Sequence, residues 1–146
     1  MHATSESRAR TRAFARVMGP WLAIVPGIIA VRAPDMDVLA SDFFRSDLFV
    51  WFAGALLLFA GLLIIAFHQY WSSLAAALIS LSGWVLAVRG LILMAAPEFY
   101  ERVGMAVNTV SLVRLMFGGL IAMGLYLTYA GWLAKPASQS ATPADE

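Results

Sequence analysis

The sequence predicts an all-α integral membrane protein, a four-helix bundle built from two similar helical hairpins. Of its 146 residues, 61% are hydrophobic and only 13% are charged, whereas soluble domains average about 45–50% apolar and about 25% charged residues. The mean hydropathy is +0.77. Four apolar runs approach or reach the length of about 20 residues that a bilayer requires, and short polar segments separate them.

A basic tail over residues 1–13 precedes the first predicted span, residues 14–32. The span contains Pro20 and Pro26, which membrane helices tolerate when neighbouring helices satisfy the freed carbonyl groups. The alternative is a signal peptide cleaved after Ala33. We disfavour it because a proline would follow the cut directly and because the chain carries an internal repeat that includes this span.

The other three predicted spans follow at regular intervals. The second, residues 48–67, contains no charged residue, and the third, residues 74–96, contains one, Arg89. The fourth covers residues 112–133 and has Arg114 in its first turn. Because charges are costly inside a bilayer, such sparse charge supports three transmembrane helices.

Two amphipathic segments, residues 34–47 and 97–111, lie between these spans. Apolar residues at helical spacing beside acidic side chains predict helices lying on the membrane surface. Residues 134–146 are small and polar, so we predict a disordered tail. The arginines of the N-terminal tail predict that both termini are cytoplasmic and that both surface segments face the opposite side.

An internal repeat relates the two halves of the chain at a shift of 63 residues. The aligned pairs are Trp21 and Trp84, Gly27 and Gly90, Pro34 and Pro97, Asp35 and Glu98, Gly61 and Gly124, and Leu62 and Leu125. Each half is then a span, a surface segment and a second span, which indicates a parallel repeat about an axis along the membrane normal. The repeated glycines favour close helix packing inside one bundle.

His68 lies in the polar stretch "FHQYWSS" between the second and third spans, and His2 is the only other histidine. A histidine can serve as a ligand, a proton relay or a pH switch. Zinc requires three or four ligands, and a bis-histidine haem within one chain requires a second intramembrane histidine. We therefore predict no metal or cofactor, and we interpret His68 as an interfacial residue beside membrane anchors. Trp71 and Trp84 are among the five tryptophans interpreted as such anchors.

Arg89 is the strongest candidate for a functional residue. An arginine inside a span is expensive and is a functional hypothesis by default. We expect its partners to be the acidic side chains of Glu98, Glu101 or Asp35. One interpretation is a structural ion pair or an arginine that snorkels to the surface. The other is a contact with an anion or a lipid headgroup, which Arg114 could share.

No pattern of residues indicates catalysis. None of the four predicted spans contains an acidic residue, which argues against a proton- or sodium-coupled pump. The sequence contains no P-loop, no nucleophile elbow and no zinc-protease motif, so we predict no catalytic residue and no enzyme activity. The net charge of +1 gives no reason to expect a nucleic-acid partner.

A short motif in the second half carries a resemblance to a known group of proteins. It is a histidine turn followed by glycine–tryptophan, a basic residue with glycine, and a proline. Its residues are His68 and Trp71, Gly83 and Trp84, Arg89 and Gly90, and Pro97. Over residues 15–133 the chain resembles an uncharacterised family of small bacterial four-helix inner-membrane proteins, and more weakly the DoxX-like membrane proteins. The resemblance implies architecture and an inner-membrane location, without a mechanism.

The sequence therefore favours a non-enzymatic accessory or scaffolding subunit of a larger bacterial inner-membrane complex. Its expected partners are the lipid bilayer and other membrane proteins or a second copy. The first alternative is a small transporter or channel for an anionic or lipid-like solute, in which Arg89 and Arg114 line the path. The second is a redox-associated membrane protein by likeness to the DoxX-like proteins.

Overall fold

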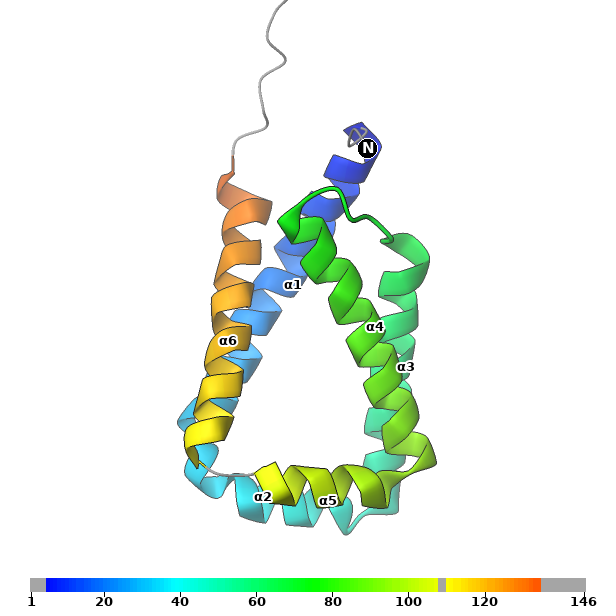
Figure 1. Ribbon diagram of the computed structural model, residues 1–146, viewed down its shortest axis with the longest axis vertical. Coiled ribbons are helices and arrows are strands. Elements are labelled where there is room, and N and C mark those ends of the chain that lie inside the picture. The colour runs from blue at the N-terminus through cyan, green and yellow to red at the C-terminus, as the bar shows by residue number, and fades with distance from the viewer. Residues whose placement is uncertain (1–4, 108–109, 135–146) are drawn as a thin grey trace, which may run out of the picture.

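A computed structural model of the chain describes residues 5–107 and 110–134 (Figure 1). Within these residues the backbone is helical apart from short connections, and it includes no strand. Four helices are long and apolar enough to cross a membrane: Ser5–Val31, Asp47–Phe67, Leu74–Ala95 and Arg114–Leu133. The all-helical class and the four candidate spans are confirmed, and the structure suggests a multi-pass membrane protein.

The helices follow the order expected from the hydropathy pattern. They are α1 (Ser5–Val31), the 3-10 turn η1 (Ala33–Asp35), α2 (Met36–Phe44), α3 (Asp47–Phe67), α4 (Leu74–Ala95), α5 (Pro97–Val107), α6 (Val110–Thr128) and the π-helical turn η2 (Tyr129–Leu133). Helix α1 begins inside the basic segment predicted as a tail over residues 1–13. The tail predicted over residues 134–146 lies outside the described residues except for Ala134.

Local chemistry explains where two of the helices begin. The Ser73 side chain accepts a hydrogen bond from the Ala76 backbone N–H at 3.2 Å, so Ser73 caps the start of α4. Helix α5 begins at Pro97, where the absent N–H costs nothing because the first helical N–H groups have no helical partner. Ser73 thus marks the start of α4, and Pro97 starts α5 directly after α4 ends.

Helices α3 and α4 pack along each other on glycines. A Cβ atom added to Gly61 of α3 would meet the backbone nitrogen of Ala87. Further along, a Cβ on Gly90 of α4 would come within 2.6 Å of the Gly54 carbonyl oxygen. Because these positions leave no room for a side chain, the two backbones approach closely at two points along the pair.

Helices α1 and α6 form the second pair, although they lie at opposite ends of the sequence. A Cβ on Gly124 of α6 would lie 2.5 Å from the Ala23 nitrogen, and one on Gly19 of α1 would lie 2.5 Å from the Thr128 nitrogen. Two arginines of α1 also bind the carbonyl groups that end α6 and η2. Arg16 Nε donates to the Gly131 oxygen at 3.0 Å, and Arg12 Nη2 donates to the Ala134 oxygen at 2.9 Å. Cations suit a helix C-terminus.

These pairs differ from the two hairpins expected from the sequence. The expected hairpins join α1 to α3 and α4 to α6, but the principal contacts are α3 with α4 and α1 with α6. Each pair thus takes one helix from each half of the repeat. The intervening helices explain the difference: α2 has 9 residues and α5 has 11, about 14 and 16 Å of helix. Packed helix axes lie about 8–10 Å apart, so α2 and α5 hold their neighbours apart.

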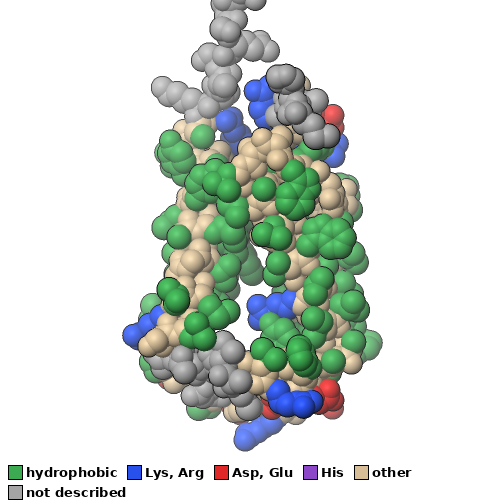
Figure 2. Space-filling view, viewed as in Figure 1, with side chains coloured by type: hydrophobic (Ala, Val, Ile, Leu, Met, Phe, Trp, Pro, Cys, Tyr) green, Lys and Arg blue, Asp and Glu red, His purple; other side chains and the backbone are tan. Residues whose placement is uncertain are grey.

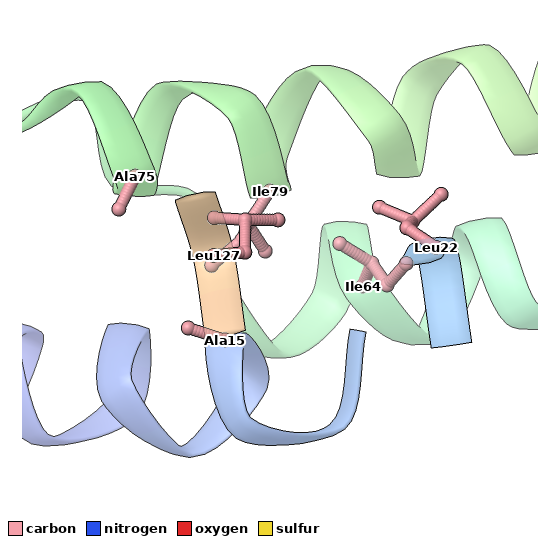
Figure 3. Close-up of a cluster of buried hydrophobic side chains, with 6 residues drawn as sticks. All are labelled: Ala15, Leu22, Ile64, Ala75, Ile79 and Leu127. Atoms are coloured by element: carbon pink, nitrogen blue, oxygen red, sulfur yellow. The ribbon is translucent and has the colours of Figure 1, made fainter. Parts of the chain in front are cut away.

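The two pairs meet at one end and diverge toward the other. Figure 1 shows α2 and α5 crossing the wide end, while the turn between α3 and α4 lies at the narrow end. Side chains from all four long helices form a buried cluster where the pairs meet (Figure 3). Its residues are Ala15 and Leu22 of α1, Ile64 of α3, Ala75 and Ile79 of α4, and Leu127 of α6. The packed core therefore supports the narrow end.

Candidate functional site

A groove on α4 and α5 contains the charge predicted to be functional. This feature, the Arg89 groove, has a volume of about 460 Å³ and is lined by Trp84, Val85, Val88, Arg89, Ile92 and Tyr100. The space-filling view shows that the molecule is hollowed between its two helix pairs and that a basic side chain projects into the hollow (Figure 2). Arg89 is the one charged residue among these lining residues, and the others are aliphatic or aromatic.

The Arg89 guanidinium contacts an aromatic ring rather than a carboxylate. Its Cζ atom lies 5.2 Å from the centroid of the Tyr100 ring, a cation–π distance. The ion pairs formed among the described residues are Arg10 with Glu6, Arg32 with Asp35 and Arg45 with Asp42, and none involves Arg89. The expectation that Glu98, Glu101 or Asp35 would pair with Arg89 is therefore wrong. Tyr100 instead lies four residues after Ala96, where the chain turns into α5, and so reaches back toward α4.

The other candidate residues fall in different places. Trp84 lines the Arg89 groove and is 49% exposed. Glu98 is exposed at the start of α5, and its carbonyl oxygen accepts a hydrogen bond from Arg102 Nε at 3.3 Å. Arg114 is exposed on α6 and is not among the groove-lining residues. The structure thus brings Arg89 and Trp84 together and leaves the others apart from them.

His68 lies in the interior at the narrow end, with none of its surface exposed. The Thr11 hydroxyl of α1 lies 3.0 Å from its Nε2 atom, and the Ser80 hydroxyl of α4 lies 3.1 Å from its Nδ1 atom. The rings of Phe14 and Tyr70 each contact the imidazole edge-on at 5.3 Å between centroids. His68 therefore joins the α3/α4 pair to α1.

The same hydroxyl groups also bind backbone carbonyls. The Thr11 hydroxyl donates to the Ser7 oxygen at 2.8 Å, and the Ser80 hydroxyl lies 3.0 Å from the Tyr70 oxygen and 3.2 Å from the His68 oxygen. Each hydroxyl has one proton, so a hydroxyl that donates this proton to a carbonyl can only accept a hydrogen bond from the imidazole nitrogen beside it. Burial lowers the pKa of His68 from its ordinary value of 6.5, and a backbone hydrogen bond at the same residue opposes this in part.

The interpretation of His68 as an interfacial residue beside exposed anchors needs correction. Trp71, three residues later, is 60% exposed, whereas His68 is buried. The polar stretch is a turn, as expected, but its first polar residue faces inward. The partners were not evident from the sequence because Thr11 lies 57 residues away. The sequence did contain one signal of a partner for His68, because Ser80 is one of few polar residues in the third apolar run.

The described part of the chain contains no group of three or more His, Cys, Asp or Glu side chains placed to hold a metal ion. The two sites thus offer different chemistry. The His68 network can respond to protons, and the Arg89 groove can bind a negative charge next to an apolar surface. No family model, curated protein or solved structure matches this chain.

Proposed function

We propose that this protein is a non-enzymatic accessory or scaffolding subunit of the bacterial inner membrane, and that its α1/α6 pair accepts a transmembrane helix of another membrane protein. The proposal includes four spans, cytoplasmic termini, and α2 and α5 on the opposite surface. The apolar lengths of the four long helices and the arginines at the narrow end support this placement.

One observation carries the proposal: three glycines of the α1/α6 pair face open space. A Cβ atom added to Gly27, Gly118 or Gly119 meets no described atom within 4 Å. Every other described glycine of the four long helices lies against a neighbouring helix. In membranes, small residues mark the places where helices approach each other, so these uncovered positions fit the helix of a partner.

The test uses the intact chain extracted from its native membrane in a mild detergent. We expect it to migrate in a complex of defined stoichiometry whose other members can be identified. Changing both Gly118 and Gly119 to Leu fills the open face, so the partner should be lost while the chain stays folded. The control is Ala66→Leu, which adds apolar bulk at an exposed position of α3. Wild-type protein that migrates alone would contradict the proposal.

A second measurement separates a foreign partner from a second copy. The natural chain contains no cysteine, so Gly118→Cys introduces a single thiol on the open face. Oxidation that links two chains to each other in membranes would identify a second copy as the occupant. Linkage is not expected if the face holds a helix of another protein.

The transporter alternative keeps one supporting observation, the charge in the Arg89 groove. Arg114 does not line that groove, so the alternative has one arginine in its path rather than two. Flux of an anionic solute in proteoliposomes that disappears in Arg89→Gln would favour it. The redox alternative rests on the DoxX-like resemblance alone, and a visible absorption band in the purified protein would be needed to support it.

A further inference from the structure

We propose that the Arg89 groove binds an anionic phospholipid, with the headgroup phosphate on the Arg89 guanidinium and an acyl chain along α4. This inference rests on the membrane insertion proposed above and is independent of any protein partner. It assigns a ligand class and an orientation to a groove separate from the open glycine face of α1 and α6.

The first argument is the position of the charge along α4. Arg89 lies six residues before Ala95, the last residue of α4, which corresponds to about 9 Å of helix. Its guanidinium extends to Tyr100 of α5, and α5 crosses the end of the long helices (Figure 1). The charge is therefore held just beneath a surface helix, the depth at which lipid phosphates meet the apolar interior.

The second argument is the order of side chains along the groove. Val88, Val85 and Trp84 precede Arg89 in α4 and thus lie progressively farther from α5. Trp84 is five residues from Arg89, about 7.5 Å along the axis. A ligand in the groove therefore contacts a cation near α5 and apolar side chains farther from α5. The same order, a charged headgroup followed by an apolar chain, is found in a lipid of one bilayer leaflet.

The third argument is that the guanidinium keeps its donors available. Tyr100 contacts the cation through its ring face, and no described carboxylate neutralises it. Arginine presents a planar set of donors that binds phosphate in a bidentate manner. The cation–π contact thus orients the guanidinium while an anion can still bind its edge.

The test compares two phospholipids with identical acyl chains, phosphatidylglycerol and phosphatidylcholine, added to the purified full-length protein in neutral detergent. Bound lipid is counted by native mass spectrometry. Both lipids carry the phosphate group that Arg89 would bind, but the choline ammonium neutralises the charge of phosphatidylcholine, so we expect the anionic phosphatidylglycerol to bind about tenfold more tightly. Arg89→Gln should abolish this preference, whereas Arg114→Gln, with the same change in net charge, should keep it. Equal loss in both variants would overturn the assignment to the groove.

Two further arms identify the ligand. Val88→Trp fills the apolar part of the groove and keeps the charge, so both lipids should bind more weakly; unchanged binding would contradict the acyl-chain contact. Inorganic phosphate at millimolar concentration should not displace phosphatidylglycerol, and full displacement would instead identify a free-anion site. Arg89 is exposed, so its replacement leaves the core intact, and helix content by circular dichroism verifies folding. Alkaline extraction of membranes tests insertion separately, so failure there is distinguishable from failure of the lipid site.

Discussion

Helix pairs α3/α4 and α1/α6 are built alike at the narrow end and differently at the wide end. Near the narrow end each pair closes on a repeat glycine, Gly61 of α3 against Ala87 and Gly124 of α6 against Ala23. The equivalence follows the internal repeat, because Gly61 and Gly124 are 63 residues apart. The shared contact shows that the repeat preserves a packing surface between the halves rather than within each half.

At the wide end the two pairs differ in their glycine contacts. In α3/α4, Gly54 lies against Gly90, whereas Gly27, the repeat equivalent of Gly90, faces open space in α1. The repeat places Phe117 of α6 where α3 has Gly54. Gly118 is the next residue, but one residue rotates a side chain by about 100° around a helix with 3.6 residues per turn. A single displaced glycine therefore accounts for a glycine contact that α3/α4 makes and α1/α6 lacks.

The largest expected effect separates the helices of the α3/α4 pair and leaves the α1/α6 pair intact. In Gly61→Leu the side chain would collide with the Ala87 backbone, which cannot move without separating the helices. Overpacking usually costs about 1–3 kcal/mol, and a clash with backbone should exceed that range and prevent folding. Gly118→Leu should not destabilise the fold, because its side chain meets no neighbour and replacing a helical glycine gains up to about 1 kcal/mol. Unfolding in detergent, followed by circular dichroism, measures both; equal destabilisation would refute the contrast between the pairs.

The next effect is a pH dependence at the junction of the two pairs. His68 has a lowered pKa when folded, so the unfolded chain binds more protons just below the ordinary value of 6.5. Its contribution to stability is complete above that pH and is lost as the pH falls toward the folded value. The free energy of unfolding should decrease by up to about 1.4 kcal/mol per pH unit in this window.

Two histidine variants make the pH test specific. Unfolding curves measured from pH 7.5 downward should lose this slope in His68→Gln, because glutamine does not titrate. His2→Gln should keep it, since His2 is the only other histidine. A slope that survives His68→Gln would assign the pH dependence to carboxylates instead.

A smaller effect concerns the hydrogen bond that links α1 to the α3/α4 pair. Thr11→Val keeps the shape of the side chain but removes the hydroxyl that lies 3.0 Å from His68 Nε2. Losing this bond should cost about 1 kcal/mol. The matched control is Ser82→Ala, whose hydroxyl bonds only within its own helix, to the Leu78 oxygen. A cost no greater than that of the control would mean that Thr11 does not join the pairs.

The smallest effect on stability sharpens the comparison most directly. Phe117→Gly gives α6 a glycine at the repeat equivalent of Gly54, so α6 should approach Gly27 of α1 more closely. Glycine in a helix costs up to about 1 kcal/mol, which the new contact should largely offset. Spin labels on the wide ends of α1 and α6 should move closer by several ångströms in pulsed EPR. An unchanged distance would show that Phe117 does not set the spacing between α1 and α6.

The hydropathy pattern predicted the long helices well because their lengths are set by local composition. The predicted spans 48–67 and 74–96 each differ from α3 and α4 by a single residue at one end. The pairing was not predictable in the same way, since it depends on the lengths of α2 and α5 and on which glycines face each other. The Arg89 partner was missed because opposite charge suggested Glu98, whereas the turn at Ala96 brings Tyr100 back onto the guanidinium. Arg89 itself was predicted because a charged residue inside an apolar run stands out in a single sequence.

The contact between α1 and α6 has a consequence for the order of events during synthesis. Helix α1 is made first and its packing partner last, so Gly19 has no neighbour until Thr128 has been added about 110 residues later. Helices α3 and α4, joined by a short turn, can associate long before. During synthesis the second and third long helices therefore pair first, and the first waits without its packing partner. Truncation before α6 leaves α1 permanently without that partner, so quality-control proteases should recognise incomplete chains by α1 rather than by the missing end.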